Sequence, residues 1–258
     1  MPDLPVSDPL SHVDRLNIDA AALGWTGRLR LARTCIQGRI VFTTSFGIEA
    51  QAVTHALAEA GLLHGPGAVE VVTFDTGRLF PETYTLWRET ELRYAIRIRA
   101  FHPRHEEVEA LVARDGVDGF YRSIAARKAC CAVRKIEPLG RALEGAAGWI
   151  TGMRAEQSVT RSRLRFAEAH RGYGLTKFYP LYDATRDEVT ALIRAGRVPY
   201  NPLEDRGFRS IGCQPCTRAV VPGEPERAGR WWWETDQEKE CGLHVDHNGR
   251  LVRTRAAA

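Results

Sequence analysis

The sequence predicts an α/β fold, in which helices cover both faces of a twisted parallel sheet. Three short apolar runs, at 39–44, 68–74 and 96–101, are each followed by a stretch whose apolar residues have helical spacing. Consecutive strand–helix units favour right-handed crossovers and therefore a parallel sheet. With 258 residues the chain is long enough to bury such a core. We expect an N-terminal arm, an α/β body and a C-terminal tail that folds over the active site, at 1–20, 21–218 and 219–258.

The first strand is expected to lead into an anion-binding turn. A helix over 23–35, in which Cys35 packs as a small hydrophobe, precedes it. The apolar run 39–44 ends in Ser45-Phe46-Gly47, and a helix follows over 48–59. Free N–H groups and the helix dipole suit such a turn to an anion. It lacks the two spaced glycines and the lysine of a Walker A loop, which agrees with a ligand that carries no triphosphate.

The second strand ends in a similar turn. The run 68–74 is apolar throughout, as a buried parallel strand should be, and it ends in Asp75-Thr76-Gly77. A helix begins near Pro81, where proline suits the first turn, and the third strand precedes a helix over 104–113. Ligands of parallel sheets lie beyond the carboxyl ends of the strands. The turns after the first two strands are therefore expected to share one ligand site.

The second half of the chain completes the sheet and then changes character. We expect a helix over 130–143, a strand over 148–152, an apolar run at 178–182 and a helix over 186–195. A basic loop, which on composition alone would equally suit a solvated charged hairpin, contains Arg154, Arg161, Arg163, Arg165 and Arg171. From 199 onward proline, glycine and charge dominate. Three successive tryptophans at 231–233 cannot all face one way, so this segment is expected to fold over the main body.

Composition and charge exclude several classes of protein. The net charge is +4, but no cationic run is interleaved with aromatic residues, so we predict no nucleic-acid partner. No run of about 18 apolar residues exists, so no membrane span is expected. The acidic N-terminus has no apolar core of a secretory signal. We therefore expect a cytoplasmic protein, in which cysteines act as metal ligands or catalysts rather than in disulfides.

Four of the six cysteines form two pairs, Cys130–Cys131 and Cys213–Cys216, which we interpret as ligands of one metal centre. The second pair has the C-x₂-C spacing of a zinc knuckle, but the first does not. Adjacent side chains on a helix diverge by about 100°, so both reach one centre only if it is large or the helix is distorted. The geometry favours an iron–sulfur cluster over zinc and leaves zinc and unrelated buried thiols open. Cys241 remains for chemistry.

In this order, these motifs resemble those of the assimilatory sulfonucleotide reductases, specifically the iron–sulfur-containing adenylyl-sulfate (APS) reductases. The matching stretches are SFGIEA at 45–50, FDTG at 74–77, CCAVRK at 130–135, TGMRAEQSVTR at 151–161, GCQPCTR at 212–218, RAGRWWWE at 227–234 and ECGLH at 240–244. The family usually has leucine where this chain has Phe74, and Ile48 also departs from its pattern. Both changes are apolar.

The resemblance implies a fold related to the ATP pyrophosphatases, which are adenine nucleotide alpha hydrolase-like. It also implies a [4Fe-4S] cluster held by Cys130, Cys131, Cys213 and Cys216. The nucleophile would be Cys241, which takes the sulfo group of adenosine 5′-phosphosulfate as an S-sulfonate and releases AMP. Thioredoxin would then free sulfite. His244 is a candidate for lowering the pKa of the Cys241 thiol, although packing or hydrogen bonding would also explain it.

The same resemblance implies which residues hold the substrate. Arg154, Arg161, Arg227 and Arg230 match positions that grip phosphate and sulfate, and a bidentate guanidinium suits such oxyanions. Lys135, four residues past Cys131, is expected to face both cluster and substrate. The adenosine end of the substrate would be held by Ser45, Phe46, Gly47, Phe74, Asp75, Thr76 and Gly77.

Three alternatives remain at this level. A reductase of the 3′-phosphorylated substrate, PAPS, is the nearest, but family members that take PAPS usually lack both cysteine pairs. A zinc-bearing pyrophosphatase-fold enzyme that modifies tRNA would need an ATP loop. A non-catalytic iron–sulfur redox sensor would not need Cys241. The oligomeric state is also open, a homo-oligomer included.

Overall fold

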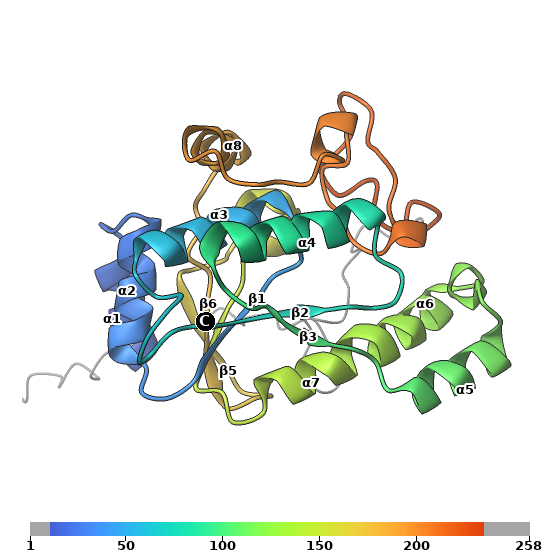
Figure 1. Ribbon diagram of the computed structural model, residues 1–258, viewed down its shortest axis with the longest axis horizontal. Coiled ribbons are helices and arrows are strands. Elements are labelled where there is room, and N and C mark those ends of the chain that lie inside the picture. The colour runs from blue at the N-terminus through green and yellow to red at the C-terminus, as the bar shows by residue number, and fades with distance from the viewer. Residues whose placement is uncertain (1–10, 235–258) are drawn as a thin grey trace, which may run out of the picture.

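The computed structural model describes residues 11–234 and contains one six-stranded sheet. The strand order is β3-β2-β1-β4-β6-β5, with β1 at the centre between β2 and β4 (Figure 1). Neighbouring strands are parallel except β5, which pairs antiparallel with β6. The bounds are Ile40–Thr43 (β1), Glu70–Phe74 (β2), Arg99–Phe101 (β3), Gly148–Ile150 (β4), Ala167–His170 (β5) and Leu175–Phe178 (β6).

Helices cover both faces of the sheet, as predicted for this fold class (Figure 1). On one side lie α3 and α4, and on the other lie α5, α6 and α7. The α-helices are His12–Ala20 (α1), Trp25–Cys35 (α2), Ile48–Glu59 (α3), Pro81–Tyr94 (α4), His105–Asp115 (α5), Ile124–Cys131 (α6), Glu137–Leu143 (α7) and Arg186–Ala195 (α8). Within residues 11–234, no helix has both the length and the apolar composition that a membrane span requires.

Alternation along the central strand β1 divides the apolar core into two layers. Side chains of successive strand residues point to opposite faces. Phe42 accordingly packs in a large cluster with residues of α1, α2, α3 and α8, whereas Val41 packs with Trp149 and with Leu139 of α7. Both β1 residues are fully buried. The predicted apolar runs therefore serve as strands covered on both faces.

The helix that carries the first cysteine pair differs from the expectation of one helix over 130–143. It begins earlier, at Ile124, where the Ser123 hydroxyl accepts a hydrogen bond from the N–H of Ala126 (3.1 Å). Directly after Cys131 the chain widens into a π-helical turn, Ala132–Ile136, before α7 begins. Insertions of this kind are rare and concentrate at functional sites. The helix is thus distorted beside the adjacent cysteines.

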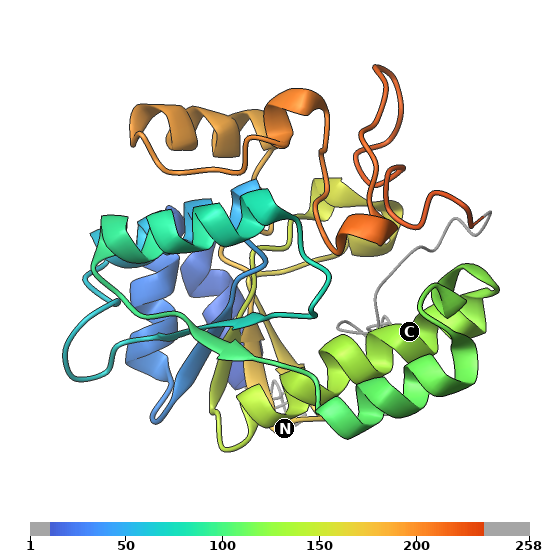
Figure 2. The same ribbon diagram turned by 45° about the vertical axis from the view of Figure 1, so that its right-hand side comes forward.

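The segment after α8 runs along the outer side of α4 to the end of the molecule at which α6 lies (Figures 1 and 2). Its short 3₁₀ turn Gln214–Cys216 holds the second cysteine pair. The three tryptophans separate as expected, because Trp231 is 1% exposed and Trp232 is 49% exposed. The backbone N–H of Trp231 donates to the carbonyl of Cys216 (3.1 Å), which fixes the segment against the second cysteine pair.

Candidate functional site

A cavity of about 200 Å³ lies at the carboxyl ends of β1, β2 and β4, where a parallel sheet binds its ligands. We call it the strand-end cavity. Most of the predicted substrate residues line it, so the two predicted turns do share one site. These lining residues are Ser45, Phe46, Gly47, Phe74, Thr76, Lys135, Arg161, Arg227 and Arg230.

The turn after β1 presents the start of α3 to this cavity. Phe46 adopts a left-handed conformation (φ 58°), unusual for a non-glycine residue, and its ring is buried 5.7 Å from that of Trp87. The Phe46 N–H donates to the Thr44 hydroxyl (3.2 Å). Gly47 is the N-cap residue of α3, and no side chain of the described residues caps this helix. First-turn N–H groups of this helix are therefore left for an anionic ligand.

The charged wall of the strand-end cavity is mainly cationic. Lys135, Arg161, Arg209, Arg227 and Arg230 line it, together with the acids Glu49 and Glu204. Sequence reasoning missed Arg209 and both acids. Arg209 precedes the GCQPC motif by a few residues, which was its only signal, and Glu49 follows the predicted turn at Gly47. An excess of cations suits a ligand with several negative charges.

Asp75 and Gly77, two of the predicted substrate residues, do not line this cavity. Asp75 accepts hydrogen bonds from Tyr84 (2.7 Å) and from the N–H of Gly77 (2.9 Å), so it shapes the turn after β2. Burial and the adjacent Asp75 carboxylate raise the pKa of Tyr84 to about 12. Gly77 has φ 70°, which permits the turn. Their contact with a substrate stays a prediction.

Arg154 does not line the cavity either, although it contacts Glu49, which does. Its side chain is completely buried, and its guanidinium donates to Glu49, Glu156 and Glu226 at 2.7 to 3.1 Å. The basic loop is therefore not uniformly solvated: Arg154 and Arg161 are buried, whereas Arg163, Arg165 and Arg171 are exposed. The predicted grip of Arg154 on the substrate remains untested.

All four paired cysteines line a second, smaller cavity, which we call the cysteine cavity. Cys131, Cys213 and Cys216 are buried and Cys130 is partly buried. Apart from Pro215, the remaining walls consist of aromatic rings and cations, namely Phe120, Trp231, Arg78, Arg127, Arg134 and Lys135. Sequence positions more than 80 residues apart thus converge, as the interpretation of one shared centre requires.

Burial and neighbouring charge act differently on these thiols. Burial raises the pKa of Cys130, and burial together with the neighbouring Cys213 raises the pKa of Cys216 to about 12. Burial also opposes ionisation of Cys213, but the Lys135 charge, a hydrogen bond with Thr76 and the charges of Arg230 and Arg134 together outweigh it, so the pKa of Cys213 is lowered. The Thr76 hydroxyl lies 3.2 Å from the Cys213 sulfur. Metal ligation requires the thiolate, which this setting favours at Cys213.

Unpartnered donors beside the cysteine cavity test whether a metal group fits. Nε of Arg134, Nε of Arg230 and Nε1 of Trp231 are buried and have no hydrogen-bond partner among the described residues. Within residues 11–234 no three His, Cys, Asp or Glu side chains are arranged around one metal ion. Four soft donors, surrounded by cations and free N–H groups, fit an anionic thiolate-bound group with several acceptor atoms.

The two cavities share a wall. Lys135 and Cys213 line both of them, and Thr76 contacts Cys213 from the turn after β2. The positive charge of Lys135 therefore acts in both cavities. Cys241 and His244, the predicted nucleophile and its neighbour, lie outside the described residues.

Comparison with known proteins agrees with this geometry. Residues 39–219 match the phosphoadenosine phosphosulfate reductase domain. An adenosine 5′-phosphosulfate reductase of Sinorhizobium fredii (strain USDA 257) is 51% identical over 89% of both chains, and one of Agrobacterium fabrum is 48% identical over 94% of this chain and 92% of its own. A crystal structure of phosphoadenylyl-sulfate reductase from Candida auris superposes with a TM-score of 0.68 at 27% identity, over 83% of this chain and 99% of that one. The chain belongs to the phosphoadenosine phosphosulfate reductase domain family.

Proposed function

We propose that this chain reduces adenosine 5′-phosphosulfate to sulfite and AMP in sulfate assimilation, with thioredoxin as the electron donor. The observation that carries the proposal is the shared wall of Lys135 and Cys213 between a cation-rich strand-end cavity and a cavity lined by two cysteine pairs. Relatives that are about half identical over most of both chains carry the name adenosine 5′-phosphosulfate reductase.

The strand-end cavity would bind the nucleotide by two different means. The turns after β1 and β2 offer backbone groups and the Phe46 and Phe74 residues to the adenosine end. The phosphosulfate would lie against four cations that line the cavity, namely Lys135, Arg161, Arg227 and Arg230. Guanidinium groups match the bidentate geometry of such oxyanions.

The first chemical step is nucleophilic. The Cys241 thiolate attacks the sulfonyl sulfur, the bond between that sulfur and the bridging oxygen breaks, and AMP takes the electron pair. Cys241 then carries an S-sulfonate. Because negative charge grows on the departing phosphate, cations placed there stabilise the transition state more than the ground state. His244 would support ionisation of the Cys241 thiol.

The second step returns the enzyme to its starting state. A thioredoxin thiolate attacks the Cys241 sulfur, the S–S bond to the sulfo group breaks, and sulfite leaves with the electron pair. The second thioredoxin thiol resolves the mixed disulfide and frees Cys241. Two thiols are oxidised to a disulfide while the substrate sulfur gains two electrons, so the balance closes. Dithiol donors of this kind imply a cytoplasmic setting.

Cys130, Cys131, Cys213 and Cys216 would hold a [4Fe-4S] cluster. Because the reducing electrons come from thiols, the cluster would not need to carry electrons. When bound, it would add its charge to the field at Lys135. Zinc is the second candidate, since the Cys213–Cys216 spacing is that of a zinc knuckle. Iron and acid-labile sulfide assays separate the two.

The decisive experiment traps the intermediate. The chain is incubated with APS in the absence of thiol, and the peptide that contains Cys241 is analysed by mass spectrometry. We expect an added SO₃ group on Cys241 and one equivalent of AMP, and neither in Cys241→Ser. A full yield of sulfite from Cys241→Ser with thioredoxin would contradict the mechanism.

Two further arms of this experiment address the alternatives. PAPS in place of APS should give a much slower reaction, and a faster one would make the chain a PAPS reductase. Retention of every measurable function in Cys241→Ser would favour a redox sensor.

A further inference from the structure

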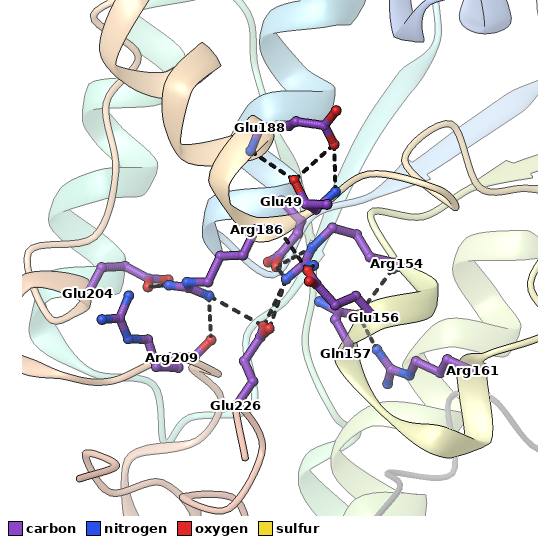
Figure 3. A network of polar contacts seen from close by, with 11 residues as sticks. Glu49, Arg154, Glu156, Gln157, Arg161, Arg186, Glu188, Glu204, Arg209 and Glu226 are labelled. Atoms are coloured by element: carbon purple, nitrogen blue, oxygen red, sulfur yellow. Dashed lines mark hydrogen bonds and ion pairs between the residues drawn. The ribbon is translucent and has the colours of Figure 1, made fainter. Parts of the chain in front are cut away.

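A buried ion-pair network joins the C-terminal segment to the body of the protein (Figure 3). At its centre, Arg154 donates to Glu49 on α3 and to Glu226 on the segment after α8. Arg186, the first residue of α8, contacts the same Glu226 (3.3 Å) and also Glu204 (2.5 Å). Five stretches of the chain, around residues 49, 154, 186, 204 and 226, therefore meet in one network.

Glu226 is the member of the network that belongs to the C-terminal segment. Both of its carboxylate oxygens accept from Nη2 of Arg154, at 3.1 and 2.9 Å, and one also accepts from Arg186. Its side chain is 15% exposed. Burial and the nearby Glu49 carboxylate raise the pKa of Glu226, whereas the two guanidinium groups oppose this shift and donate hydrogen bonds that hold the side chain in place.

The position of Glu226 in the sequence gives this contact a consequence for the site. Arg227 follows Glu226 directly, and Arg230 comes three residues after Arg227. Both arginines line the strand-end cavity. Beyond them, Glu234 forms a second buried ion pair with Arg127 on α6 (2.9 Å, each side chain 2% exposed). The two cavity arginines thus lie between two carboxylates that are inserted into the body.

We propose that Glu226 is a positioning residue, which holds the 226–230 segment so that Arg227 and Arg230 face the nucleotide phosphate. The inference rests on the proposed function for the identity of the ligand. It goes beyond it by assigning a role to a residue that does not line the cavity. Arg154, whose predicted role was to grip the substrate, acts in this account through Glu226.

The sign of the effect separates positioning from a simple field effect. Replacing Glu226 by glutamine removes a negative charge near an anion site, which by itself would strengthen anion binding. Loss of positioning would weaken it. The variant should also fold, because Arg154 retains Glu49 and Glu156, and Arg186 retains Glu204.

The test is the dissociation constant of AMP, measured by calorimetry on the full chain with its metal content preserved. We expect Glu226→Gln to raise it about tenfold, and to raise the KM for APS similarly. The amplitude of Cys241 sulfonation at saturating APS should not change, whereas a folding defect would lower it. Glu224→Gln is the matched control, since Glu224 bonds Arg218 and the N–H of Val221 within the same segment.

The outcomes are distinct. Weaker AMP binding in Glu226→Gln with an unchanged Glu224→Gln supports positioning. Equal or tighter AMP binding in Glu226→Gln overturns it, and so does an equal loss in both variants. If the wild-type chain neither binds AMP nor takes a sulfo group from APS, the proposed function fails instead.

Discussion

The strand-end cavity and the cysteine cavity adjoin each other but are built in opposite ways. The first is framed by strand ends and helix starts, and its walls carry backbone groups, cations and two acids. The second is framed by a distorted helix and a 3₁₀ turn, and thiols, aromatic rings and cations form its walls. The first arrangement suits a ligand that binds and dissociates, and the second suits a permanently bound group.

This difference explains why Lys135 has an unusual position. It extends from the π-helical turn after Cys131 and lines both cavities. The Lys135 charge lowers the pKa of Cys213 on one side, and on the other side Lys135 lines the strand-end cavity. The two sites are therefore expected to depend on each other through a few shared residues, and variants of those residues test the comparison.

The largest expected effect comes from Cys213→Ser, because Cys213 belongs to both cavities. Serine is a poor ligand for iron, so we expect loss of bound iron and of detectable sulfite formation, measured by iron assay and product analysis. Cys35→Ser is the control, since Cys35 ends α2 and lines neither cavity. Full activity in an iron-free Cys213→Ser would separate the two cavities and break the comparison.

Lys135→Gln should give the next largest effect. Removal of a cation that meets developing charge costs about 10²–10³ in turnover. We expect that loss in sulfite formation with iron content retained, measured by steady-state kinetics and iron assay. Lys128→Gln, which changes an exposed lysine of the preceding helix α6, should behave as wild type. A tenfold loss or less in Lys135→Gln would make this residue an ordinary wall residue.

Glu204→Gln should give the smallest effect, and it depends on pH. Burial raises the pKa of Glu204 from 4.5 to about 7, against the opposing effect of Arg186. Between these values the unfolded chain binds fewer protons than the folded one, so the free energy of unfolding falls as pH rises, by about 1.4 kcal/mol per pH unit from this group. Above pH 7 the fall ends.

Glutamine at 204 cannot titrate, so Glu204→Gln should lose this part of the pH dependence. Thermal unfolding midpoints of both proteins at pH 5, 6, 7 and 8 measure it. The unfolding midpoint of the variant should rise relative to that of wild type up to pH 7. Above pH 7 the difference between the two midpoints should stay constant. If the two midpoints differed by the same amount at all four pH values, the pKa of Glu204 would not be raised in the folded protein.

Much of the fold followed from local sequence signals. The helices over 48–59 and 186–195 have the predicted bounds, and the second begins with a capping box between Thr185 and Glu188. The antiparallel strand β5 was missed, because Ala167–His170 is short and polar at two positions. The stretch expected as an arm contains α1, whose Leu16 packs into the core.

The site was only partly predictable, for a physical reason. Motifs name the residues that contact ligands, and most of those do line the strand-end cavity. Motifs do not reveal which charged residues are paired, so the burial of Arg154 among three carboxylates could not be read from the sequence. The π-helical turn after Cys131 likewise depends on what the helix packs against.

One measurement tests the central claim that one cavity keeps its contents while the other exchanges them. The chain is purified without oxygen, saturated with AMP, dialysed, and assayed for iron, acid-labile sulfide, zinc and AMP. The account predicts about four iron and four sulfide per chain after AMP has gone, as for a [4Fe–4S] cluster on four cysteines. Zinc without sulfide, or retention of AMP and loss of iron together, would contradict it.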